Sequence, residues 1–182
     1  DSPHARFGIM TGGKAYLDTR QALADLGLDD ETCSRIGIRL YKVGCVWPLE
    51  AHGARAFANG LQEILVVEEK RQVIEYQLKE ELYNWRSDVR PNVVGKFDEG
   101  EVHAAEGYSG GEWSMPNPTA HTLPRANADL NPALIAKAIV QRLKKLGLLQ
   151  AAGSDMVARI DTQMAILEAK ERAMLVMQTG GV

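Results

Sequence analysis

The segment 35–81 constrains the fold of this chain more than any other part of its sequence. It contains two apolar runs, 36–43 and 64–67, and each run ends in turn or charged residues and leads into a segment with helical periodicity. An uninterrupted apolar run such as 64–67 is typical of a strand that is buried on both faces, as in a parallel sheet. The alternation therefore predicts an α/β fold in which helices flank a mostly parallel sheet.

Further strands are expected on either side of this segment. The short apolar run 7–10 is followed by turn residues at 11–14 and by a helix over about 15–26, which Gly27 ends. Residues 93–94 form a short apolar pair that predicts a fourth strand. The first part of the chain thus supplies at least four strands and the helices that connect them.

The sequence beyond residue 130 predicts two amphipathic helices. Asn131 is a good N-cap, Pro132 suits the first helical position, and apolar residues recur at helical spacing up to about Leu146. Ser154 caps a second helix that runs to about Met177. The apolar stripes of these helices must be buried against the sheet domain, against each other or against a missing part of a longer protein.

The stretch between these two parts is rich in glycine and proline and poor in apolar residues. This composition predicts an irregular or partly disordered linker, and a loop of this length is uncommon inside a compact domain. We therefore expect three parts: an α/β domain over 1–95, a linker over 96–130 and a helical extension over 131–182.

The composition of the chain excludes two classes of protein. The net charge of the 182 residues is -3 and most basic residues are scattered, so nothing indicates nucleic-acid binding. Arg142, Lys144 and Lys145 do cluster, but they stand near a helix end, where they complement the negative end of the helix dipole. No apolar run approaches the length that spans a membrane.

The two cysteines, Cys33 and Cys45, form no Cys-x-x-Cys pair. Because neither has other ligand residues nearby, we expect no metal site or iron–sulfur cluster within the chain, and a reducing cytoplasm fits best. Cys45 is expected to be a packed, inert thiol. The first residues include neither an initiator Met nor a signal-peptide core, so we expect a piece of a longer protein.

Four residues at the end of the first strand are candidates for binding an anion: Thr11, Gly12, Gly13 and Lys14. They stand at a helix N-terminus, where backbone N–H groups, a hydroxyl and an ammonium could hold a phosphate or a carboxylate. The segment lacks the spacing of a Walker loop and the third glycine of a dinucleotide fingerprint. We therefore favour the alternative, a tight turn that requires glycine torsions.

Glu68 and Glu69 end the third strand, where open sheets of this class usually present functional groups. They could act as an acid–base pair or position a cofactor. The alternative, which we favour, is that they complement the dipole of the helix that follows. The histidines His52, His103 and His121 have no metal-ligand spacing to one another. We expect no catalytic residue and no metal ligand in the chain.

Three strings of residues carry a resemblance to a known family. They are FGIMTGGKAY at 7–16, GIRLYKVGCVWPL at 37–49 and ILVVEEK at 64–70. The chain resembles one domain of the 2-oxoacid:ferredoxin oxidoreductases, in particular the indolepyruvate ferredoxin oxidoreductases in the long fused form found in proteobacteria. The helix that begins at Asn131 also resembles the segment that leads toward the diphosphate-binding domain of that family. The string from Lys42 to Leu49 is the most specific part.

The resemblance implies a three-layer α/β domain with the transketolase C-terminal fold, whose mixed sheet has one antiparallel strand. It also implies the reaction of the complete enzyme. An aryl 2-oxoacid such as indolepyruvate is decarboxylated on thiamine diphosphate with magnesium, coenzyme A takes up the acyl group, and electrons pass through iron–sulfur clusters to ferredoxin.

This chain has none of the cysteine arrays, the magnesium- and diphosphate-binding string or the domain with the catalytic glutamate that the complete enzyme requires. We therefore expect a non-catalytic structural and assembly domain that holds no cofactor and is inactive alone. Its partners would be other domains or subunits of the parent oxidoreductase, and ferredoxin through that enzyme, but neither nucleic acid nor membrane. Assembly into a homo-oligomer stays open.

Two alternatives remain. The first is a stand-alone α/β module that binds an anion or another small ligand through the turn at 11–14. The second is an assembly module whose C-terminal helices pair with another copy of the chain or with missing domains of the parent protein.

Overall fold

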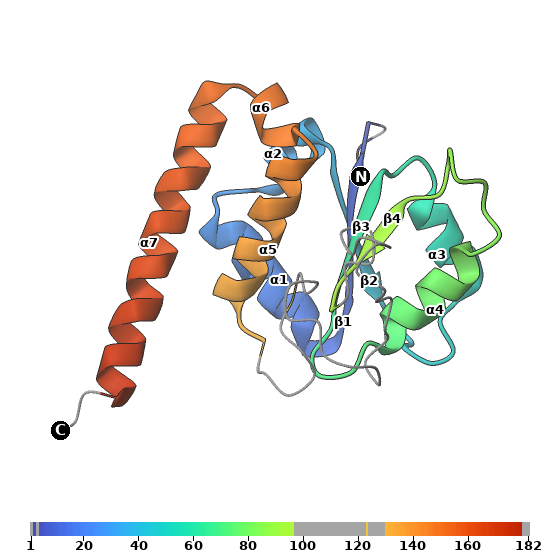
Figure 1. Ribbon diagram of the computed structural model, residues 1–182, viewed down its shortest axis with the longest axis horizontal. Helices are drawn as coiled ribbons and strands as arrows, with labels where there is room; N and C mark the ends of the chain where they lie inside the picture. The colour runs from blue at the N-terminus through green and yellow to red at the C-terminus, as the bar shows by residue number, and fades with distance from the viewer. Residues whose placement is uncertain (1, 3, 97–122, 124–129, 180–182) are drawn as a thin grey trace, which may run out of the picture.

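The computed structural model describes residues 2, 4–96, 123 and 130–179, and these residues form a four-stranded sheet (Figure 1). The strands are β1 (Phe7–Gly12), β2 (Ile38–Val43), β3 (Glu63–Val67) and β4 (Asn92–Val94). They stand in the order β2-β1-β3-β4, and every neighbouring pair is parallel. The parallel sheet expected from the sequence is confirmed, and the antiparallel strand that the resemblance implies is not among the described strands.

Helices cover both faces of the sheet (Figure 1). One face packs against α3 (Ala51–Ala58) and α4 (Val73–Leu82), and the other against α1 (Gly13–Asp25), α2 (Asp30–Ile36) and α5 (Pro132–Lys145). The short helix α6 (Leu148–Ala151), which the sequence pattern does not predict, leads from α5 to α7 (Ser154–Thr179). The three-layer α/β architecture with a C-terminal helical region is therefore confirmed, with α7 outside α5 (Figure 1).

Strand β1 shows why both faces of the sheet need a cover. Phe7 and Ile9 belong to the hydrophobic cluster beneath α1 and α5, whereas Met10 belongs to the cluster beneath α3 and α4. All three side chains are fully buried. Every residue of β3 is buried as well, which agrees with its uninterrupted apolar run. The alternation of side chains along β1 thus separates two hydrophobic cores.

Helix α5 packs on the sheet domain. Ile135 and Ile139 are fully buried in the cluster that contains Phe7 and Ile9. The cluster also contains Ile160 and Leu167 of α7, so of the three burial sites that the sequence leaves open, the structure shows two: the sheet domain and the other C-terminal helix. The division of the chain into three parts stays a prediction.

Most of the expected linker, residues 97–122 and 124–129, lies outside the described residues. Leu123 and Leu130 are described, and both are buried in the same cluster as α5. The backbone N–H of Leu123 donates to the carbonyl of Gly95 at 2.9 Å. These two leucines therefore extend the core that lies between the sheet and α5.

A buried ion pair ties α5 to the sheet. Arg142 donates from Nε and Nη2 to the two carboxylate oxygens of Glu63, at 2.5 Å in each case. Both side chains are buried, and Asn92 donates to the same carboxylate at 3.0 Å. The sequence-based explanation of Arg142, a complement to the helix dipole, leaves out this pair with a residue 79 positions away.

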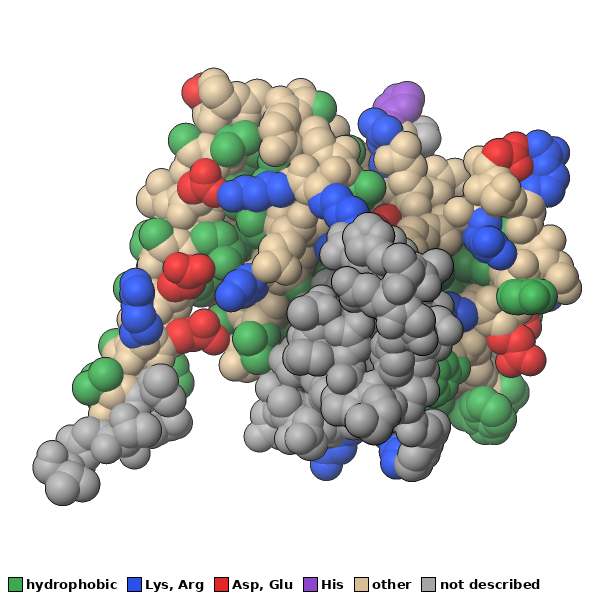
Figure 2. All heavy atoms as spheres, in the orientation of Figure 1, with side chains coloured by type: hydrophobic (Ala, Val, Ile, Leu, Met, Phe, Trp, Pro, Cys, Tyr) green, Lys and Arg blue, Asp and Glu red, His purple; other side chains and the backbone are tan. Residues whose placement is uncertain are grey.

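Helix α7 is covered along only part of its length. Ile160 and Leu167 are buried, as the predicted stripe requires, whereas Met174 of the same stripe is 61% exposed. Lys144 of α5 pairs with Asp161 of α7 at 2.7 Å. Figure 2 shows charged and hydrophobic side chains interspersed along this helix. Neither α7 nor any other described helix combines the length and apolarity needed to cross a membrane.

Candidate functional site

The carboxyl ends of the parallel strands meet at one edge of the sheet, which is where open α/β sheets bind ligands. After β1 the chain turns to α1 on one face, and after β3 it turns to α4 on the other face. The neighbouring strands β1 and β3 therefore flank a topological switch point. A depression of about 240 Å³ lies there, and Gly12, Gly13, Lys14, Glu68 and Glu69 are among the residues that line it.

The candidate anion-binding residues lie at this edge. Gly13 has a φ of +55°, a torsion that favours glycine, as the tight-turn interpretation requires. Lys14 donates to Asp18 at 2.6 Å and lies 3.8 Å from Glu69, so carboxylates of the chain already accompany its charge. Thr11 is fully buried, and its hydroxyl has no hydrogen-bond partner among the described residues. Anion binding at this turn stays a prediction.

Glu68 is the acidic residue at this edge whose pKa departs clearly from its ordinary value. Its carboxylate accepts hydrogen bonds from the backbone N–H groups of Ile74 at 2.7 Å and Glu75 at 3.0 Å, at the start of α4. Burial raises the pKa of this carboxyl to about 7, although the two N–H bonds and the charge of Lys96 act to lower it. The carboxylate of Glu75 adds to the increase. The favoured interpretation, in which Glu68 complements the following helix, agrees with this geometry.

Glu75 is a second buried carboxylate, which the sequence analysis missed. It is bonded to Lys79 at 2.9 Å, and its other oxygen accepts from the backbone N–H of Lys96 at 3.0 Å. A Cβ atom on Gly95 would stand 2.5 Å from Glu75 Oε2, so this close approach requires glycine. The i, i+4 spacing of Glu75 and Lys79 was the available signal, but it does not show that the pair is buried.

The carboxylates of the two adjacent glutamates have different partners. The oxygens of Glu68 are directed to the N–H groups of α4. Glu69 lies near Lys14 of α1 instead. The structure therefore brings Glu69 together with the candidate anion-binding turn and keeps Glu68 with the helix that it caps.

The loop after β2 brings the most specific string of the sequence to the same edge. Trp47 is 70% exposed. Cys45 is exposed as well, and its thiol donates to the Trp47 carbonyl at 3.2 Å, so the expected packed thiol is not found. Gln77 of α4 holds the loop, because it accepts from the Leu49 N–H at 2.7 Å and donates to the Val46 carbonyl at 2.8 Å. The sequence analysis missed Gln77, since its pattern is that of any polar residue on a helix surface.

The remaining candidates within the described residues offer no further chemistry. The described part of the chain has no group of three or more His, Cys, Asp or Glu residues that could hold a metal ion. His52 is exposed on α3, whereas His103 and His121 lie outside the described residues. The Cys33 thiol faces the Leu28 carbonyl at 3.6 Å, and burial raises its pKa to about 11. A thiol that stays protonated in this way is a poor nucleophile and a poor metal ligand.

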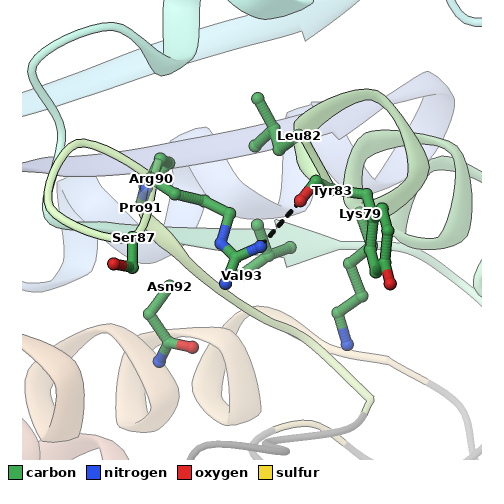
Figure 3. Close-up of a pocket in the computed structure, with 8 residues that line it drawn as sticks. All are labelled: Lys79, Leu82, Tyr83, Ser87, Arg90, Pro91, Asn92 and Val93. Carbon is green, nitrogen blue, oxygen red and sulfur yellow. Dashed lines mark hydrogen bonds between the residues drawn. The ribbon is translucent and has the colours of Figure 1, made fainter. Parts of the chain in front are cut away.

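A second hollow, of about 470 Å³, lies between the end of α4 and β4 (Figure 3). Arg90 reaches toward α4 and donates to the Tyr83 carbonyl at 2.8 Å (Figure 3). Lys79 and Asn92 also line this hollow, and each is bonded to a buried carboxylate. The switch point lies at the carboxyl ends of the parallel strands, where sheets of this class bind ligands, so it is the better candidate site.

Nearly the whole length of the chain matches one known protein family. A model of the indolepyruvate ferredoxin oxidoreductase middle domain matches residues 1–177. The chain belongs to this family. The resemblance carried by the strings at 7–16, 37–49 and 64–70 is confirmed, and the matched range also includes the C-terminal helices of this middle domain.

Relatives of this middle domain are subunits of indolepyruvate oxidoreductases from archaea. The IorA subunit of Pyrococcus horikoshii is 35% identical over 92 residues, which are 50% of this chain and 13% of that subunit. The IorA subunit of Thermococcus kodakarensis is 32% identical over 80 residues, 44% of this chain and 11% of the subunit. The IorA subunit of Pyrococcus abyssi is 33% identical over 75 residues, which are 41% of this chain and 10% of that subunit. The chain therefore matches only 10–13% of the length of these relatives.

Proposed function

We propose that this chain is a non-catalytic structural and assembly domain of a cytoplasmic indolepyruvate ferredoxin oxidoreductase. The parent enzyme would convert an aryl 2-oxoacid such as indolepyruvate to an acyl-CoA, with thiamine diphosphate as cofactor and ferredoxin as electron acceptor. The family match over residues 1–177 supports this parent enzyme, and the names of the relatives agree with it. The partners of the domain are then other domains or subunits of the same oxidoreductase.

The observation that supports a non-catalytic role is the hydrogen bonding of two buried carboxylates, Glu68 at the switch point and Glu75 on α4. Glu68 accepts two N–H groups of α4, and Glu75 is bonded to Lys79 and to the backbone of Lys96. A general base must reach a proton of the substrate, and a nucleophile needs such a base beside it. Here the oxygen atoms of both carboxylates are directed to groups of the domain itself, so they hold α4 in place.

Neither the number of cysteines in the chain nor the side chains of its described part fit the cofactors of the parent enzyme. An iron–sulfur cluster is typically held by four cysteine thiolates, and the chain has two cysteines. A magnesium ion beside a diphosphate needs carboxylate or carbonyl oxygens, and the described residues include no cluster of acidic side chains that could hold a metal. We therefore place the cofactors in other domains of the parent enzyme and assign no step of the reaction to this chain.

An activity assay tests this proposal. The purified chain is mixed with indolepyruvate, coenzyme A, thiamine diphosphate, Mg²⁺ and a viologen dye as artificial electron acceptor, and reduction of the dye is followed by absorbance. We expect no reduction above the rate without protein. A complete indolepyruvate oxidoreductase is the positive control. Turnover by the chain alone would contradict the non-catalytic role.

A further inference from the structure

Four apolar side chains form an exposed surface beside the switch point, which we name the aromatic patch: Val46, Trp47, Val73 and Tyr76. Trp47 is 70% exposed, and the other three are 38–46% exposed. Figure 2 shows hydrophobic side chains gathered at the surface over α4 and below it. Single exposed apolar residues are ordinary, but a group that includes an exposed tryptophan is typical of an interaction surface.

One side chain holds the two halves of the aromatic patch together. The amide nitrogen of Gln77 donates both to the Val46 carbonyl and to the Val73 carbonyl, at 2.8 Å in each case. The loop after β2 and the first turn of α4 therefore lie side by side. Tyr76 is fixed as well, because its hydroxyl accepts from Gln72 at 2.9 Å.

The loop that carries Trp47 is anchored at both of its ends. Val43 before it and Leu49 after it are buried in the hydrophobic cluster under α3 and α4. Glu50 caps α3 by accepting from the N–H groups of His52 at 2.8 Å and Gly53 at 2.7 Å. The exposure of Trp47 is thus a property of an ordered loop. A loop that is already ordered loses little backbone conformational entropy when a partner covers it.

The charges at this edge are mixed, since Glu68 and Glu69 line the depression together with Lys14 and Arg71, but Glu68 is buried and Glu69 lies 3.8 Å from Lys14. Lys70 and Arg71 are exposed in the turn before α4, and Arg71 lines the same depression as Val46 and Val73. Charges at the rim of an interface favour a partner of opposite charge. The surface therefore suits a partner that offers an apolar cavity with carboxylates on its rim.

We propose that the aromatic patch is the surface on which a neighbouring domain of the same oxidoreductase docks, with Trp47 inserted into an apolar cavity that carboxylates border. This proposal rests on the proposed function. The family model describes a middle domain, and the matched part makes up 10–13% of the relatives' subunits, so a parent of this kind has further domains to cover the surface. Trp is also among the residues that contribute most to binding energy in interfaces.

Alkylation of Cys45 reports whether this surface is covered. Cys45 is exposed two residues from Trp47, whereas Cys33 is half-buried elsewhere and, with its raised pKa, should react slowly and at the same rate in both samples. Iodoacetamide is added to the isolated chain and to the complete oxidoreductase, and peptide mass spectrometry measures each rate. We expect Cys45 to react at least about tenfold more slowly in the complete enzyme, because docking must open before the reagent enters. Equal rates at Cys45 in the two samples would overturn the proposal.

The variant Trp47→Ala tests the anchor itself. In the complete enzyme we expect it to raise the alkylation rate of Cys45 by roughly 30-fold, the change in a docking equilibrium that loss of a central aromatic residue produces. The control is Leu17→Ala, since Leu17 is 66% exposed on α1 and should leave the rate unchanged. The isolated Trp47→Ala chain should unfold at the wild-type temperature. A lower unfolding temperature of this isolated variant than of the wild-type chain would show that Trp47 supports the fold, and would also overturn the proposal.

These results separate the docking proposal from the proposed function. A reactive Cys45 in a fully active wild-type enzyme would contradict docking and leave the non-catalytic role intact. Loss of turnover in Trp47→Ala while Cys45 stays protected would mean that Trp47 acts in the chemistry. That outcome would contradict both.

Discussion

The two ends of strand β3 each bury a glutamate, and the fold treats the two residues differently. At the amino end, both carboxylate oxygens of Glu63 are bonded to the guanidinium of Arg142 at 2.5 Å, and both side chains are buried. At the carboxyl end, Glu68 accepts instead from two backbone N–H groups of α4, at 2.7 and 3.0 Å. Burial raises the pKa of Glu68 to about 7, although these two bonds and the charge of Lys96 act to lower it.

This difference separates an end of the sheet that stabilises the fold from an end that faces a partner. The ion pair of Glu63 and Arg142 joins the sheet to α5 across the amino end. The carboxyl end instead exposes Trp47 and the loop around it. It also tolerates a backbone strain, since Lys70 has a φ of +61°. The same strand therefore ends in a fixed support on one side and in a docking surface on the other.

The largest effect on the free energy of unfolding is expected at the amino end of β3. Arg142→Met should lower the free energy of unfolding by about 3–5 kcal/mol, because it leaves the carboxylate of Glu63 buried without its partner. Urea unfolding of the chain measures this change. Lys144→Met is the control, since the exposed pair with Asp161 should be worth less than about 1 kcal/mol. If Arg142→Met lowers the free energy of unfolding no more than Lys144→Met does, the two ends of β3 do not differ in the way described.

The carboxyl end should make stability depend on pH near neutrality. The pKa of Glu68 is about 7 in the folded chain and about 4.5 when unfolded, so the folded state binds more protons between these values. Stability should therefore fall as pH rises through this window, by a total on the order of 3 kcal/mol. Unfolding by urea from pH 5 to pH 8 measures the slope. In Glu68→Gln this dependence of the free energy of unfolding on pH should vanish. If the variant keeps the wild-type dependence, another titrating group causes it.

The strained turn at the carboxyl end should yield a smaller gain. Lys70→Gly is expected to raise the free energy of unfolding by about 1 kcal/mol, because glycine adopts a positive φ without steric cost. Thermal unfolding compares it with Lys70→Ala, which removes the same side chain and keeps the strain. If both variants have the wild-type midpoint, the turn stores no strain that matters for stability.

The smallest effect is expected at the turn after β1. Lys14 is exposed and paired with Asp18, so Lys14→Ala should change the free energy of unfolding by less than about 0.5 kcal/mol. Calorimetric titration of the wild-type chain with inorganic phosphate should show no binding. Micromolar phosphate binding that Lys14→Ala abolishes would instead favour the stand-alone anion-binding module.

The apolar runs predicted the fold because they depend on local periodicity. The run 64–67 became a strand that is buried throughout, and the residues after β1 and β3 came together at one edge, as parallel strands require. The order β2-β1-β3-β4 could not be predicted, because alternating strands and helices do not specify which strand is central. The family resemblance supplied the identity of the domain that periodicity alone could not.

The polar contacts of the domain, at the site and away from it, were harder to predict, because they join residues that are distant in the sequence or depend on burial. The partners Glu63 and Arg142 are 79 positions apart, and no local pattern links them. Glu75 and Gln77 have the spacing of solvent-exposed helix residues, yet one is buried against β4 and the other holds the loop of Trp47. Burial decides the role of each of these polar side chains, and burial depends on the tertiary packing around it.

Steady-state kinetics of the complete oxidoreductase with Glu68→Gln and Glu69→Gln together test the central claim most directly. Both changes keep the shape of the side chains and remove the carboxylates from the switch point. If this edge serves assembly alone, the kcat and kcat/KM of the assembled variant for indolepyruvate should stay within about threefold of wild type. A loss of about 10²–10⁴ in kcat with assembly intact, the effect of removing a general acid or base, would contradict the account.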